Sequence, residues 1–296
     1  MSILTLGEGG DLLAAARQAP AMILRLLVLF AVLSATPAAA APDVRLYTLD
    51  CGRLTQENGD FYADDGAYKG MTRLLVVPCF LIRHPKGDLL WDTGLPQSIA
   101  DRPGGQGPDW VVVTRKLTDQ LAQLGLKPAD IEYLSLSHSH YDHSGNAGLF
   151  AGSTWIVDAR ERAHAFRPAA RAEASEFAAY AALEDARTLL MEGDAPHDVF
   201  GDGAVRIIAA PGHTPGHRVL LVSLPQAGPV LLSGDMWHLA ESRAARRVPR
   251  FNTDRAQTLR SMDAVEALAA ETQARIVRQH VPEDIAALPA FPEALR

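Results

Sequence analysis

The sequence predicts an α/β fold in which helices cover layers of sheet. Short apolar segments typical of strands alternate with segments of helical periodicity, and Gly- and Pro-containing turns separate them. Of the 296 residues, 48% are hydrophobic and 21% are charged, a composition that supports a substantial buried core. We therefore expect one large folded domain over residues 41–296, preceded by an N-terminal extension over residues 1–40.

The extension carries the pattern of a secretory signal peptide. An apolar stretch begins at Met22 and ends in small residues, and residues 38–40 (AAA) fit the A-x-A pattern of a cleavage site. We expect cleavage to leave a mature chain that starts near Ala41. This chain would be periplasmic or secreted, without stable insertion in the membrane. A retained membrane anchor is the alternative interpretation.

Strand and helix patterns succeed one another along the domain. The predicted strands are residues 44–49, 74–82, 89–91, 131–136, 154–157, 205–209, 219–223, 230–232 and 274–277. The predicted helices, the second of them rich in alanine, are residues 117–124, 160–191 and 252–271. A long loop at residues 53–71 carries Phe61, Tyr62 and Tyr68, which either cover a site or anchor the loop to the core.

Charge and cysteine content exclude two classes of protein. A formal net charge of -7 disfavours a protein that binds a nucleic-acid backbone. Two cysteines, Cys51 and Cys79, are too few for a disulfide-built scaffold. Cys79 lies within the apolar segment 74–82, so we expect a buried free thiol; a single disulfide between the two cysteines is the alternative.

A cluster of side chains able to bind metal follows the predicted strand at 131–136. The segment SHSHYDHSG contains His138, His140, Asp142 and His143. Imidazole and carboxylate groups suit divalent first-row ions such as zinc, and the absence of cysteine from the cluster argues against a closed structural site. His138 and His140 can point to one metal position while Asp142 and His143 point to a neighbouring one, so the segment predicts two metal ions.

Three further candidate ligands follow later strands. They are His213 in APGHTPGH, Asp235 in LLSGD and His280 in RQH. Strands that release such side chains at one edge of a sheet build an open catalytic site. We therefore expect all three to join the first cluster.

With these motifs in this order, residues 44–280 resemble the metallo-β-lactamase superfamily. The resemblance implies an αββα sandwich with a dimetal site at one edge of the two sheets. The resemblance implies that one ion is held by His138, His140 and His213. It implies that the other is held by Asp142, His143 and His280, and that Asp235 bridges the two ions. The segment WDTG also matches, and implies that Asp92 orients a ligand histidine; a turn-forming Asp is the alternative.

Within the superfamily, the sequence is most similar to the N-acyl-homoserine lactonase branch. The shared segments are LDCG, PCFLI, SHSHYDHSG and PGHTPGH. Branches that hydrolyse antibiotics generally lack a bridging carboxylate at position 235, and 16 residues after His280 are too few for the glutathione-binding helices of glyoxalase II. The resemblance implies a quorum-quenching hydrolase that opens small-molecule lactones, with a broader esterase or β-lactam hydrolase as the alternative.

Metal-assisted hydrolysis fits this ligand set. A bound divalent ion lowers the pKa of water to about 7 and polarises a carbonyl. Asp142 or Asp235 would move the proton. By family likeness, residues 53–71 and 160–191 would shape an acyl pocket and contribute to a homodimer interface.

The remaining histidines have weaker assignments. The lactonase branch often has a tyrosine three residues after the bridging carboxylate, near the substrate carbonyl, and here that position is His238. His238 either donates the same hydrogen bond or is an ordinary surface histidine. For His217 we expect a supporting hydrogen bond rather than metal ligation. We expect solvated side chains at His84, His164 and His197.

Overall fold

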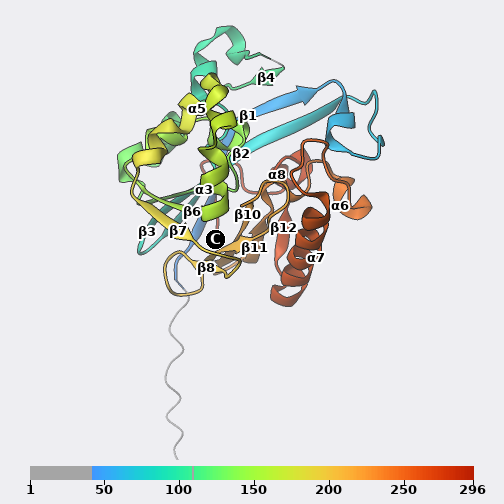
Figure 1. The fold of residues 1–296 in the computed structure, drawn as a ribbon. Helices are drawn as coiled ribbons and strands as arrows, with labels where there is room; N and C mark the ends of the chain where they lie inside the picture. Colours follow the sequence, from blue (N-terminus) through green and yellow to red (C-terminus); the bar gives the residue numbers. More distant parts are fainter. Residues whose placement is uncertain (1–41, 109) are drawn as a thin grey trace, which may run out of the picture. The chain divides into compact units, whose positions relative to one another are not determined.

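The computed structural model describes residues 42–108 and 110–296. These residues form two β-sheets packed face to face, with helices on the outer faces of the sheets (Figure 1). These layers confirm the predicted αββα sandwich. The predicted signal peptide lies outside the described residues, and the domain boundary at residue 41 stays a prediction. Within the described ranges, no helix has the length and apolar character needed to cross a bilayer.

The first sheet is mixed and has eight strands among the described residues. In spatial order they are β13 (Ala294–Leu295), β1 (Arg45–Gln56), β2 (Arg73–His84), β3 (Gly87–Trp91), β5 (Tyr133–Ser135), β6 (Thr154–Asp158) and β7 (Thr188–Met191), with β4 (Val111–Val112) beside β1. β3, β5, β6 and β7 run parallel to one another, so their carboxyl ends lie at one edge of the sheet.

The second sheet has five strands within residues 42–108 and 110–296. Their spatial order is β12 (Arg275–Val277), β11 (Gly228–Leu232), β10 (Arg218–Leu224), β9 (Val205–Ala209) and β8 (His197–Asp198). β11 and β12 are parallel, whereas the other pairs are antiparallel. Two parallel carboxyl ends therefore lie together in this sheet as well.

Alternation of apolar side chains along the strands builds the layers. Phe80 and Ile82 of β2 belong to the core between the sheets, together with Leu220 of β10. Leu81, between the first two, belongs instead to the core under the helices that cover the first sheet. Successive side chains of a strand point to opposite faces, so a strand that is apolar at every position supplies two cores at once.

Helices cover the two outer faces. They are α1 (Leu117–Gln123), α2 (Tyr141–Ser144), α3 (Ala159–Ala165), α4 (Pro168–Ala172), α5 (Ala174–Tyr180), α6 (Ser242–Ala245), α7 (Arg255–Thr272) and α8 (Pro282–Ala286). Leu121 of α1 packs on the first sheet, and Met262 and Val265 of α7 pack on the second.

Two predicted boundaries are wrong. Residues 160–191 do not form mostly one helix: Pro168 begins a separate helix, and residues 188–191 form β7, which pairs with β6. Proline lacks the backbone N–H that would continue the preceding helix, so α3 ends before it. The loop predicted over residues 53–71 is shorter, because β1 continues to Gln56 and pairs with the start of β2.

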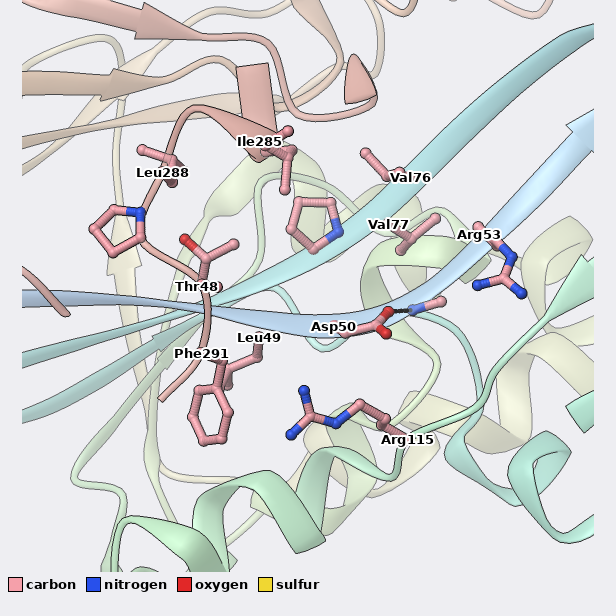
Figure 2. Close-up of a pocket in the computed structure, with 15 residues that line it drawn as sticks. Thr48, Leu49, Asp50, Arg53, Val76, Val77, Arg115, Ile285, Leu288 and Phe291 are labelled. Atoms are coloured by element: carbon pink, nitrogen blue, oxygen red, sulfur yellow. Dashed lines mark hydrogen bonds between the residues drawn. The ribbon is translucent and has the colours of Figure 1, made fainter. Parts of the chain in front are cut away.

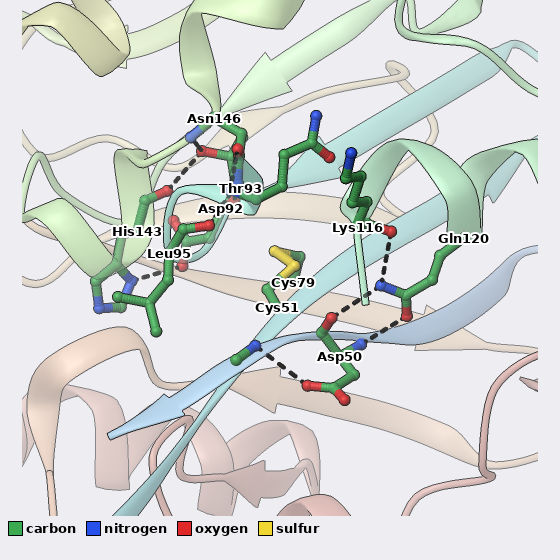
Figure 3. Close-up of a disulfide and its surroundings, with 12 residues drawn as sticks. Asp50, Cys51, Cys79, Asp92, Thr93, Leu95, Lys116, Gln120, His143 and Asn146 are labelled. Carbon is green, nitrogen blue, oxygen red and sulfur yellow. Dashed lines mark hydrogen bonds and ion pairs between the residues drawn. A yellow bond between two sulfur atoms is a disulfide. The ribbon is translucent and has the colours of Figure 1, made fainter. Parts of the chain in front are cut away.

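The expectation of a free thiol at Cys79 is also wrong. Cys51 and Cys79 form a disulfide between β1 and β2, with their Cα atoms 5.8 Å apart (Figure 3). The register of the two strands shifts between Asp50 and Arg53, and this irregularity contains Cys51. The apolar surroundings predicted for Cys79 are confirmed, but the strand register that brings Cys51 beside it has no local sequence signal.

His84 is buried, contrary to expectation. Only 7% of the residue is exposed, and its ring stacks on Phe200 with the ring centroids 4.1 Å apart. Its Nε2 atom lies 3.1 Å from a carboxylate oxygen of Asp202. His164 and His197 are half-buried rather than fully solvated.

Candidate metal centre

The predicted ligands emerge where strands end. β5 leads into the segment that carries His138, β9 leads to His213, β11 to Asp235 and β12 to His280. The parallel pairs β3–β5 and β11–β12 place several of these ends side by side. The fold therefore converts motifs more than 100 residues apart into one cluster.

All seven predicted ligands come together in two groups. In each group the potential ligand atoms lie within 4.8 Å of one another; the groups are His138, His140, His213 and Asp235, and Asp142, His143 and His280. In the first, Nδ1 of His140 lies 2.9 Å from Nε2 of His138 and 3.2 Å from Nε2 of His213. Converging imidazole nitrogens of this kind suit a shared cation.

Asp235 lies between the two groups. Its Oδ2 atom is 3.5 Å from Nε2 of His138 and 3.4 Å from Nε2 of His213. Its Oδ1 atom is 3.1 Å from Nε2 of His143 and 2.8 Å from Nε2 of His280. One oxygen thus faces each group, which is the arrangement that a bridging carboxylate requires.

The outer nitrogens of the ligand histidines orient these rings. His143 donates from Nδ1 to Oδ2 of Asp92 over 3.0 Å, and His280 donates from Nδ1 to the carbonyl oxygen of Val76 over 2.9 Å. Each bond leaves the Nε2 lone pair directed inward, ready to bind a metal. Burial holds the pKa of His138 well below 6.5, so its imidazole is neutral, the form that binds metal. The residues therefore fit divalent cations.

His217 has the supporting role expected from the sequence. Its Nδ1 donates to the carbonyl oxygen of Ala210, and its Nε2 accepts from the backbone N–H of Asp235, both over 3.0 Å. Burial lowers its pKa to about 3, which keeps Nε2 free to accept. His217 thus holds the backbone of the residue between the two groups.

Comparison with known proteins agrees with this geometry. The sequence model of the metallo-beta-lactamase superfamily matches residues 72–280, which include every residue of the two groups. The chain belongs to the metallo-β-lactamase superfamily. The histidines and aspartates of the two groups are therefore the candidate metal-binding groups of this fold.

Relatives within the superfamily share nearly the full length of the domain. N-acyl homoserine lactonase AttM from Azorhizobium caulinodans is 33% identical over 261 residues, which cover 85% of this chain and 97% of AttM. An N-acyl homoserine lactonase from a Bacillus species is 30% identical over 257 residues, covering 84% of this chain and 98% of the relative.

Solved structures show the same fold. A mutant of Bacillus thuringiensis AiiA, with N-decanoyl-L-homoserine bound at the active site, is similar with a TM-score of 0.70 and 25% identity. The match covers 85% of this chain and 98% of AiiA. An N-acyl homoserine lactone hydrolase with N-hexanoyl-L-homoserine at its catalytic metal centre matches equally well, with the same TM-score and coverage.

Glu161, which the sequence does not single out, joins the loop of His138 and His140 to the loop of His213. Glu161 of α3 accepts hydrogen bonds from the N–H of Ser139 (2.8 Å) and the hydroxyl of Thr214 (2.6 Å), one with each oxygen. It is only 3% exposed. A glutamate within an alanine-rich segment gives no functional signal, because its partners lie 22 and 53 residues away.

His238 is buried, so the alternative of an ordinary surface histidine is wrong. Its Nε2 atom lies 3.0 Å from Oδ2 of Asp235, and only 3% of the residue is exposed. Its ring packs on Tyr62 and Phe251, with ring centroids 5.2 and 5.3 Å away. Burial lowers its pKa to about 4. His238 therefore belongs to the wall of the metal centre.

A cavity of about 270 Å³ opens onto the metal centre. His140, Asp142 and His280 line it together with Phe61 and Tyr62. Tyr68 instead anchors its loop: it is buried, and its hydroxyl lies 3.3 Å from that of Ser242. The aromatic residues of the predicted loop thus divide between the two roles left open by the sequence.

Another cavity, of about 370 Å³, lies between β1 and the segment around α8 (Figure 2). Its walls are mainly apolar, and Arg53, Arg115 and Asp50 supply the charged groups. Among the described residues that line it there is no histidine or cysteine. Of these two cavities, the smaller one is therefore lined by the candidate metal ligands.

Proposed function

We propose that this protein is a metal-dependent hydrolase that opens the ring of N-acyl homoserine lactones. The observation that supports this proposal most directly is that the two groups of candidate metal ligands lie together beside a cavity. The substrate class rests on the relatives named N-acyl homoserine lactonases, which match 84–85% of this chain.

We propose that the site holds two divalent ions, with zinc as the expected metal. The first would be held by His138, His140, His213 and Asp235, and the second by Asp142, His143, His280 and Asp235. When bound, such ions lower the pKa of water to about 7 and polarise the lactone carbonyl. Nitrogen and oxygen ligands also suit iron, cobalt and manganese, so metal analysis has to establish the identity.

Two side chains of the cavity would move protons or orient the substrate. Asp142 is partly exposed in the cavity, so its carboxylate can accept a proton from the attacking water. The water oxygen bonds to the lactone carbonyl carbon, and the bond from that carbon to the ring oxygen breaks. Asp142 passes the proton to the ring oxygen, which becomes the hydroxyl of N-acyl homoserine. His238 would donate a hydrogen bond to the substrate carbonyl.

The acyl chain would extend past Tyr141. This side chain lines both the metal cavity and a second cavity of about 540 Å³. Ile99, Val111 and Ala179 give the second cavity apolar walls. An acyl chain leaving the metal centre over Tyr141 would bury its methylenes there, each worth about 0.8 kcal/mol.

The test is proton release from acyl homoserine lactones of short and long chain, with purified mature protein before and after chelation. We expect turnover that chelation abolishes and added metal restores. No turnover by protein with two metals bound would refute the substrate assignment. Equal turnover of nitrocefin would favour the alternative, a broader esterase or β-lactam hydrolase.

We also propose that the protein works in the periplasm or outside the cell. The disulfide between Cys51 and Cys79 supports this, since disulfides persist in oxidising compartments. Cell fractionation with N-terminal sequencing tests it: a cytoplasmic protein with residues 1–40 retained would refute it. The homodimer stays a prediction, and the molar mass of the protein in solution, measured by light scattering, tests it.

A further inference from the structure

Gln279 is a fully buried polar residue directly before the ligand His280. Its exposed fraction is 0%, and its Nε2 atom donates to Oδ2 of Asp92 over 2.6 Å. Its Oε1 atom is buried without a hydrogen-bond partner among the described residues. A buried amide oxygen without a hydrogen-bond partner destabilises the folded state. Stability alone therefore does not explain why a glutamine occupies this position, and the bond from its amide nitrogen to Asp92 suggests a functional reason.

Asp92 connects Gln279 to the metal centre. Its Oδ2 atom accepts from Gln279, from Nδ1 of His143 over 3.0 Å and from the hydroxyl of Ser137 over 3.0 Å. Its Oδ1 atom accepts from the N–H of Ser137 over 2.6 Å. Asp92 also has a φ of 59°, which a residue other than glycine rarely adopts. Its conformation therefore depends on these bonds.

Gln279 thereby joins two ligands of the same group. Its amide nitrogen lies 3.3 Å from Nδ1 of His143 and also reaches that ring through Asp92, and through the backbone Gln279 is continuous with His280. Nε2 of His143 and Nε2 of His280 are 3.2 Å apart, so a small rotation of either ring changes the pair. Within the part of the chain that the structure describes, no hydrogen bond joins the side chain of Gln279 to His138, His140 or His213. Asp92 does reach His138 through Ser137, whose hydroxyl lies 3.0 Å from Nδ1 of that ring, but the backbone N–H of Ser137 holds this link without Gln279.

We propose that Gln279 is a positioning residue for the metal site of Asp142, His143 and His280. It fixes Asp92 and the start of the His280 loop in one arrangement, and so sets the distance between the two rings. The inference rests on the proposed metal-dependent function. Partners behind the ligands typically change metal affinity by about 10- to 100-fold.

The test compares Gln279→Met with Gln120→Met. Methionine keeps the length of the side chain and removes the amide. Gln120 is a matched control, because it is also fully buried. Among the described residues its amide bonds only to the backbone of Asp50 and Lys116, away from the candidate metal ligands (Figure 3). The full mature protein is titrated with Zn²⁺ against a competing chelator, and bound metal is counted.

We expect Gln279→Met to bind one ion like the wild type and the other about 10- to 100-fold more weakly. Gln120→Met should bind both normally, even where its unfolding midpoint falls as much. Wild-type affinity for both ions in Gln279→Met, or the same loss in Gln120→Met, would overturn the proposal. A wild type that binds no pair of ions would instead refute the proposed function.

A second variant covers a failure of Gln279→Met to fold. Gln279→Asn retains the amide but is one methylene shorter, so it cannot donate to Asp92 from the same backbone position. It should show the same selective loss of one ion. Normal binding of both ions by Gln279→Asn would contradict the assignment.

Discussion

Replacing Arg218 by Met tests how the two sheets are held together beneath the metal centre. Arg218 of β10 and Asp158 of β6 are each 1% exposed. The guanidinium donates to Oδ2 of Asp158 from Nε (2.9 Å) and Nη2 (2.5 Å), and Nη2 also donates to the carbonyl oxygen of Gly193. The backbone N–H of Arg218 bonds to the oxygen of Ser137, next to His138.

The expected loss follows from these contacts. Removing one partner of a buried ion pair costs about 3–5 kcal/mol, because the other charge stays buried. Arg160 still donates to both oxygens of Asp158, so we expect the lower end, about 3 kcal/mol. For a domain of this size, that corresponds to a fall of roughly 6–12 °C in Tm.

The loss should depend on pH. Burial raises the pKa of Asp158, but the hydrogen bonds from Arg160 and the charge of Arg218 outweigh it and lower this pKa below 3.8. A lowered pKa stabilises the folded state above the pKa of the unfolded state, and this contribution is lost as the pH falls through the folded-state pKa. The gap between wild type and Arg218→Met should therefore be full at pH 7 and shrink below about pH 4.

Urea unfolding followed by circular dichroism measures the difference in unfolding free energy between wild type and Arg218→Met. Both proteins are treated with a chelator first, so that bound metal does not contribute to this difference. The control is Arg45→Met, which removes an exposed ion pair with Asp43 and should leave the midpoint near that of the wild type. A loss below about 1 kcal/mol at pH 7, or a gap that stays constant down to about pH 3, would refute the reasoning.

Four further outcomes are expected. Asp235→Ala should lower bound metal and lactone turnover together, since one oxygen faces each group; full activity with both metals retained would contradict the bridge. His238→Phe keeps a ring but removes the donor, so kcat should fall about 100-fold with metal content unchanged; an unchanged kcat counts against its role. Replacing Cys51 and Cys79 by Ala should cost about 3–4 kcal/mol by loop entropy for a separation of 28 residues, measured by urea unfolding without reductant; equal stability would disagree. Ala179→Trp narrows the proposed acyl cavity and should lower kcat/KM about tenfold for decanoyl but not butyryl homoserine lactone, whereas equal losses would place the acyl chain elsewhere.

Much of the fold was predictable because strand and helix signals are local. The apolar segment at 74–82 lies within β2, and the helix predicted at 252–271 closely matches α7. The metal motif was predictable for a related reason: its first four ligand-capable residues occupy six positions, and the chemistry of imidazole and carboxylate does not depend on the fold.

Where a local signal competes with a tertiary partner, the partner decides. Residues 188–191 continue a segment rich in alanine, yet they form β7 because β6 offers an unpaired edge beside them. Cys79 looks like an apolar core residue, yet the strand irregularity beside it brings Cys51 within bonding distance. Propensities are weaker than such pairings, which add backbone hydrogen bonds or a covalent link.

The sequence alone predicts which side chains could bind metal, and it predicts that strands present them. The packing of the two sheets is needed to show which buried side chains support these candidate ligands. Glu161, Gln279 and Arg218 act on residues 53, 187 and 60 positions away, respectively. The alignment of loops at the end of two packed sheets sets those contacts, and a single sequence carries no periodicity or motif that records such an alignment.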